Sequence, residues 1–119
     1  MSIPVVMAEL VDRLTDPEAD PAVLVTADPI EAGNNRPCLL VVPPAVDYVG
    51  GTFETPNMEC RVMALARSSV FGQDAVDEIA ALIDHAGPLL PELTRAEPTL
   101  YRLAPETLVP AYVLTFDTL

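Results

Sequence analysis

Cys60, His85 and Asp84 are the side chains of this sequence that could supply the parts of a nucleophilic catalytic site. A catalytic thiol needs a base beside it and an acid that orients the base, and Asp84 would supply the acid. Asp84 and His85 are neighbours on an expected helix, however, so their side chains point about 100° apart. No nucleophile-turn motif of the G-x-S-x-G type accompanies them. We therefore expect the cysteines to be core residues and His85 to interact with the dipole at its helix end.

Other chemistries find no supporting motif. Metal sites use cysteine and histidine ligand pairs at short spacing, and Cys38, Cys60 and His85 form no such pair. The Gly50-Gly51 loop lacks the phosphate-binding pattern, which ends in a lysine that this chain does not contain. Glycosidases use a pair of carboxylates for catalysis. Such pairs are numerous here only because the chain is acidic, so they indicate no glycosidase site. The sequence thus predicts a protein that is not an enzyme and that uses no cofactor or metal.

The charge of the chain is strongly unbalanced. Eighteen acidic residues stand against six basic ones, all arginine, which gives a formal net charge of −12. Nucleic-acid binding needs a basic face, and acidic surfaces are repelled by anionic membranes. We find no signal peptide and no apolar run of membrane-spanning length, so we expect a protein of the reducing cytoplasm with its cysteines as thiols. The simplest explanation of the charge is solubility.

The apolar pattern of residues 3–14 predicts an amphipathic helix with Ser2 as its cap. Its apolar positions are Ile3, Val6, Met7, Leu10, Val11 and Leu14. Residues 23–25 favour a short edge strand. Asp28-Pro29 and residues 33–35 have the composition of turns.

A continuous apolar run at residues 38–42 predicts a central strand buried on both faces. Pro43-Pro44 should kink it before a continuation to residue 49. A loop through Gly50-Gly51 carries Phe53 and Glu54, and a second strand begins at Met58. One face of that strand should hold Met58, Cys60, Val62, Ala64 and Ala66. The other face is mixed and should hold Glu59, Arg61, Met63, Leu65 and Arg67.

Residues 73–86 form the strongest helix prediction, with a stop signal at Gly87-Pro88. The expected inward stripe is Val76, Ile79, Ala80, Ile83 and Ala86. Residues 99–103 and 109–118 read as two strands around a turn at 104–107, with Tyr112, Leu114 and Phe116 on one face. The chain is therefore expected to form one α+β domain over residues 1–119. Its sheet should be mostly antiparallel and flanked by two helices, in the approximate order α-β-β-β-α-β-β.

This order resembles the bacteriophage tail terminators of long-tailed phages, the lambda-type family of small proteins that complete the tail. Residues 36–44, the Gly-Gly loop and residues 59–65 are similar to the first hairpin of that family. The helix at 73–85 follows in the same place, and Tyr101 and Tyr112 lie in a C-terminal hairpin like that of the family. The resemblance covers essentially the whole chain.

The resemblance implies a structural virion protein located in the tail or neck and assembled in the bacterial host cytoplasm. Such a protein forms a ring, a homohexamer, that caps the tail tube and ends its polymerisation. It also provides the surface that joins the tail to the head–tail connector or stopper protein. DNA passes through the lumen without specific binding. No membrane is involved.

A cyclic ring needs two different complementary patches on each subunit. The candidate interaction residues are Phe53, Glu54, Arg61, Met63, Leu65 and Arg67, and the N-terminal helix stripe is a further candidate. Packing inside the domain is the alternative explanation for the helix and strand residues. Two other functions stay open: another neck component, such as a head–tail stopper or adaptor, and an acidic protein-binding module.

Overall fold

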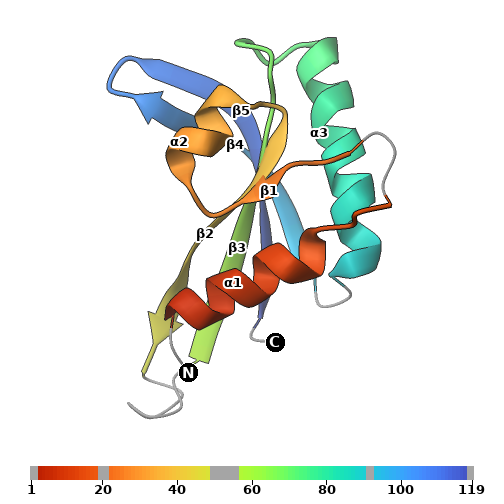
Figure 1. Cartoon of the computed structure of the whole chain (residues 1–119). Helices are drawn as coiled ribbons and strands as arrows, with labels where there is room; N and C mark the ends of the chain where they lie inside the picture. Colours follow the sequence, from red (N-terminus) through yellow and green to blue (C-terminus); the bar gives the residue numbers. More distant parts are fainter. Residues whose placement is uncertain (1–2, 19–21, 49–56, 91–92, 118–119) are drawn as a thin grey trace.

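The computed structural model describes residues 3–18, 22–48, 57–90 and 93–117. These residues form three α-helices and five strands, with one short 3-10 turn after the last helix; Figure 1 shows how they are arranged. In chain order they are α1 (Ile3–Leu14), β1 (Val25–Thr26), α2 (Pro29–Asn34), β2 (Cys38–Asp47), β3 (Asn57–Leu65), α3 (Gln73–Ala86), η1 (Gly87–Leu89), β4 (Leu93–Ala104) and β5 (Thr107–Asp117). None of the described helices is long and apolar enough to span a membrane.

The five strands form one sheet in the order β1-β2-β3-β5-β4. All neighbours are antiparallel except β1, which pairs with β2 in parallel. The pairing of β2 with β3 shifts between Val42 and Ala45, at the predicted Pro43-Pro44 kink. The α+β prediction is confirmed, with one compact domain, a mostly antiparallel sheet and nearly the predicted element order.

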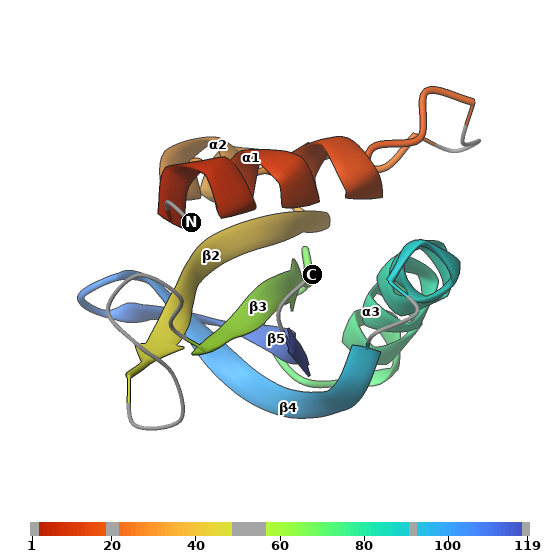
Figure 2. The same cartoon turned by 90° about the horizontal axis from the view of Figure 1, so that it is seen from below.

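Helices α1 and α3 pack on one face of the sheet and close the larger core. Val6, Leu10 and Leu14 of α1 are buried there, so the inward part of the predicted stripe is confirmed. The first predicted face of β3 points into the same cluster, together with Leu114 and Phe116 of β5. In Figure 2, α1 lies across β2 while α3 lies beyond β3 and β5, so the two helices cover different parts of the curved sheet.

Helix α2 covers the opposite face, and the sequence interpretation of this segment as turns was wrong. Asp28 caps the helix by accepting a hydrogen bond from the Ile30 amide at 3.0 Å, and Pro29 stands in the first turn. Both features are helix start signals as well as turn signals, because capping acids and proline suit the first turn. Ala32 of α2 packs over Cys38 and Leu40 in a second, smaller core cluster.

The bounds of α3 agree with the prediction. The face that it packs on the sheet, however, is rotated about the helix axis relative to the predicted face. The residues that it buries are Ala75, Ile79, Leu82 and Ala86. Val76 is 47% exposed, Ala80 is exposed and Ile83 is half-buried. The helix therefore has an apolar arc that is wider than the sheet can cover.

The C-terminal hairpin is longer than predicted. β4 begins at Leu93 instead of residue 99, and β5 begins at Thr107. Tyr112, Leu114 and Phe116 do share one face, as expected. β4 is an edge of the sheet, and its residues 94–98 are exposed on both faces.

Candidate functional site

The predicted interaction residues do not form one surface. Phe53 and Glu54 lie outside the described residues. Met63 and Leu65 are buried in the second core cluster, where they pack with Cys38, Leu40 and Ala111. The alternative explanation, packing inside the domain, accounts for these two side chains, so they offer no surface to a partner.

The two candidate arginines differ in their surroundings. Arg61 lies in the middle of β3, half-buried, and its Nη2 donates to the Pro43 carbonyl at 3.5 Å. Its Nε is buried, and among the described residues it has no hydrogen-bond partner. Arg67 follows the end of β3 and is exposed. Six residues of extended chain, about 20 Å, separate the two, so they do not act on one small ligand.

The thiols lie on opposite faces of the sheet. Cys38 belongs to the cluster under α2, and Cys60 belongs to the cluster under α1 and α3. Neither forms a disulfide, and both are buried. Burial raises the pKa of the Cys38 thiol from 9.0 to about 11, against a smaller lowering effect of Arg36. A thiol with this pKa is protonated at neutral pH and is a poor nucleophile.

His85 joins two helices. Its Nε2 lies 2.8 Å from the carbonyl oxygen of Leu14, the last residue of α1. A second hydrogen bond runs from α1 to the end of α3: Arg13 Nε donates to the carbonyl of Leu89, just after α3, at 2.9 Å. The C-terminal ends of α1 and α3 are thus linked by two hydrogen bonds, and the role of His85 in the described structure is to hold them together.

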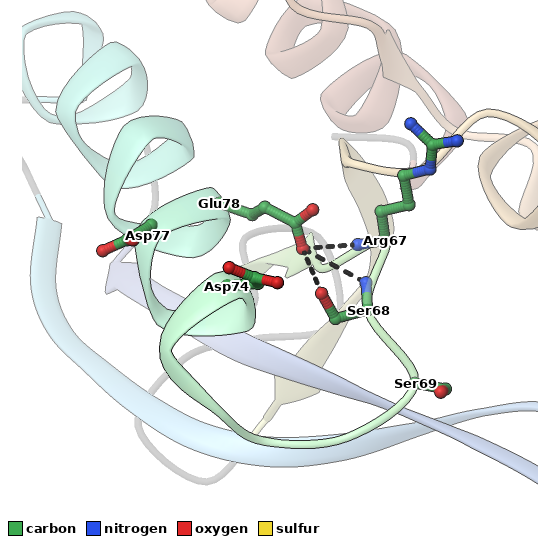
Figure 3. Close-up of a pocket in the computed structure, with 6 residues that line it drawn as sticks. All are labelled: Arg67, Ser68, Ser69, Asp74, Asp77 and Glu78. Carbon is green, nitrogen blue, oxygen red and sulfur yellow. Dashed lines mark hydrogen bonds between the residues drawn. The ribbon is translucent and has the colours of Figure 1, made fainter.

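A shallow depression lies between residues 67–69 and the first turns of α3 (Figure 3). Glu78 Oε1 accepts three hydrogen bonds of 3.1 Å, from the Arg67 amide, the Ser68 amide and the Ser68 hydroxyl. This carboxylate fixes the loop that leads into α3. In Figure 3 the Arg67 side chain points away from the depression and Asp77 lies on the far side of the helix.

The remaining acids of the depression do not converge on a ligand. Asp77 accepts a hydrogen bond from Gln73 Nε2 at 2.8 Å, within the same helix. Across residues 3–18, 22–48, 57–90 and 93–117, no three side chains of the histidine, cysteine or acidic kind gather as metal ligands would. The hydrogen bonds of this depression therefore hold the loop at residues 67–69 against α3.

Two exposed apolar surfaces were missed by the sequence interpretation. The first lies on the β4–β5 hairpin, where Leu100 is 54% and Leu108 is 42% exposed. The second lies on α3 around Val76, which the predicted stripe had placed inside. A signal for the second was present, because eight apolar positions in a helix of fourteen residues form an arc too wide for one contact.

Phe71 adds to the exposed apolar surface near the hairpin. Its ring meets the Tyr112 ring edge-on, with centroids 6.3 Å apart, and it remains 44% exposed. Val70 beside it is exposed as well. Large apolar side chains exposed in a group are typical of protein contact surfaces.

Comparison with known proteins assigns no family. No protein-family model matches this chain, and no relative is found among curated proteins.

Proposed function

We propose that this protein is a structural component of a phage virion that forms a hexameric ring on the end of the tail tube. The ring ends polymerisation of the tube and presents a surface to the head–tail connector. It acts through protein contacts alone, with no catalytic step and no cofactor.

The observation that supports this proposal is the order and pairing of the elements. Helix α1 precedes a β2–β3 hairpin, α3 follows it, and the β4–β5 hairpin completes the same sheet. This order of elements is the one on which the resemblance to tail terminators rests. The exposed apolar residues on α3 and on the hairpin add support, because a ring subunit needs two separate contact surfaces.

Electron microscopy tests the proposal directly. The purified protein is imaged by negative stain, alone and mixed with its candidate tail tube protein. We expect six-lobed rings or capped tube ends, and tubes of controlled length. A monomer that leaves tube ends bare and tube length uncontrolled would contradict the proposal.

The acidic charge of the chain favours a second candidate function, that of an acidic module that binds a basic protein. A net charge of −12 would give such binding a steep dependence on salt. Binding of a basic partner that is lost between low and physiological salt, without ring formation, would favour this candidate.

A further inference from the structure

Among the described residues, no element covers one face of the β4–β5 hairpin near its tip, where Leu100 and Leu108 are exposed. The cross-strand pairs Leu100–Pro110 and Arg102–Leu108 place these four side chains on one face, since paired and alternate residues share a face. The other face of the hairpin carries Leu103, which approaches Gly33 of α2. We call Leu100, Arg102 and Leu108 the hairpin patch.

The hairpin patch combines exposed leucines with a positive charge. Leu100 and Leu108 are each about half exposed, and Arg102 is exposed beside them. Arg102 Nη1 donates to the Pro105 carbonyl at 2.6 Å, which holds its guanidinium on the hairpin. In a chain with six basic residues against 18 acidic ones, an exposed arginine among leucines marks where an acidic partner can bind.

The outer flank of α3 has the complementary composition. At 100° per residue, Val76, Asp77, Ala80 and Asp84 fall within an arc of about 100° that is turned away from the buried stripe. All four side chains are exposed. We call these residues the helix patch; it has an apolar strip bordered by two carboxylates.

The two patches cannot meet within one molecule. Figures 1 and 2 both place the hairpin tip and α3 at opposite ends of the molecule. A contact between them therefore joins one copy to the next, and because the patches differ, each copy keeps one patch for another neighbour. Helices pack readily on sheet faces, as α3 itself does inside the domain.

From this arrangement we infer that the helix patch of one copy binds the hairpin patch of the next, head to tail, with Arg102 facing Asp77 and Asp84 across the contact. The inference rests on the proposed ring and names the surfaces that would build it. Val76 and Ala80 would cover Leu100 and Leu108. Repetition of the same contact would either close a ring or continue as a chain.

Three single substitutions test the contact, all of the same kind at exposed apolar positions. Val76→Glu damages the helix patch and Leu108→Glu damages the hairpin patch. Ile30→Glu on α2, where the side chain is 76% exposed, is the matched control outside both patches. Circular dichroism and thermal unfolding first establish that each variant is folded.

Masses are then measured by analytical ultracentrifugation over a range of concentrations. We expect Ile30→Glu to assemble like the unchanged protein, whereas Val76→Glu and Leu108→Glu should each remain a monomer. An equimolar mixture of these two variants should form a dimer and nothing larger. In that dimer the intact hairpin patch of Val76→Glu meets the intact helix patch of Leu108→Glu, and both remaining patches are damaged.

The possible failures can be told apart. If both single variants assemble like the unchanged protein, the ring stands and these patches are not its interface. If each variant is a monomer and their mixture also stays monomeric, the head-to-tail pairing is wrong. If the unchanged protein is itself monomeric, with and without tube ends, the proposed function and this inference both fail.

Discussion

Arg36 shows how a charged side chain of this protein serves the backbone. Its Nη1 donates to the carbonyls of Ala66 and Arg67 at 3.0 and 3.3 Å, and its Nε lies 3.4 Å from the Gly33 carbonyl. One guanidinium thus joins the end of α2 to the end of β3. Arginine suits this position because its donors form a rigid planar group that is always charged.

Removal of this side chain should destabilise the domain. We expect Arg36→Ala to lower the free energy of unfolding by about 1–3 kcal/mol, because partly buried carbonyls lose their donors. Urea denaturation provides the measurement. Arg95→Ala is the matched control: its salt bridge to Glu97 is solvent-exposed, so its loss should cost less than about 1 kcal/mol. Equal losses in the two variants would contradict the role of Arg36.

The buried Cys38 thiol should make stability depend on alkaline pH. Its pKa is about 11 in the folded protein and near 9.0 once exposed, so between these values the folded state binds more protons than the unfolded state. Stability conferred by Cys38 is therefore complete below about pH 9 and is lost as the pH rises towards 11.

Urea midpoints between pH 7 and 11 test this for the unchanged protein and for Cys38→Ala. The alanine variant should lose less stability over the alkaline part of this range, because it lacks the Cys38 thiol while all other ionisable groups are common to both proteins. Parallel curves would show that the thiol is not shielded in the folded state.

At the scale of elements, the orientation of α3 in the structure differs from the orientation predicted from the sequence, and this difference can be tested. Leu82 is buried and Val76 is not. We expect Leu82→Ala to cost about 2–5 kcal/mol through lost packing and a residual cavity. Val76→Ala should change the stability of the monomer by about 0.5 kcal/mol or less, because alanine favours the helix and little buried area is lost.

Thermal or urea unfolding of dilute protein compares the two variants under conditions where copies do not associate. A large loss for Val76→Ala with a small loss for Leu82→Ala would restore the stripe predicted from the sequence. The same pair of variants also separates packing inside the domain from contacts between copies, since only Val76 belongs to the helix patch.

Much of the fold could be predicted from local patterns. The bounds of α1 and α3 follow from apolar residues at helical spacing, and β2 and β3 follow from a continuous and an alternating apolar run. The first half of β4 was missed because Pro98 and its exposed neighbours give no alternation. The parallel pairing of β1 was beyond prediction, since strand direction depends on how the chain returns across the sheet.

The candidate site was harder to predict than the fold. Alternation on β3 placed Met63 and Leu65 on the correct face, but only the position of α2 decides that this face is covered. The α2 segment resembles a turn because the same residues start both structures. The exposure of Leu100 and Leu108 depends on which element packs on the hairpin. The local sequence pattern does not predict that packing.

For the whole molecule, the acidic charge leads to a prediction about DNA. The six arginines stand against 18 acidic residues; Arg13 and Arg36 direct donors to backbone carbonyls, and Arg95 pairs with Glu97. We expect no retardation of duplex DNA by the protein in native gels, even at low salt, because net repulsion acts over about a Debye length. Retardation that disappears on addition of salt would contradict the prediction and would imply a basic surface formed on assembly.

The placement of the two thiols also bears on durability outside a cell. Cys38 and Cys60 are the only sulfhydryl groups of the chain, and both are sealed in core clusters on opposite faces of the sheet. A phage particle leaves a reducing host for aerated water, where accessible thiols oxidise and neighbouring copies can become covalently cross-linked. While it is folded, this chain exposes neither of its thiols to that process. A ring built from it would keep its subunit contacts free of disulfide cross-links during long storage between infections.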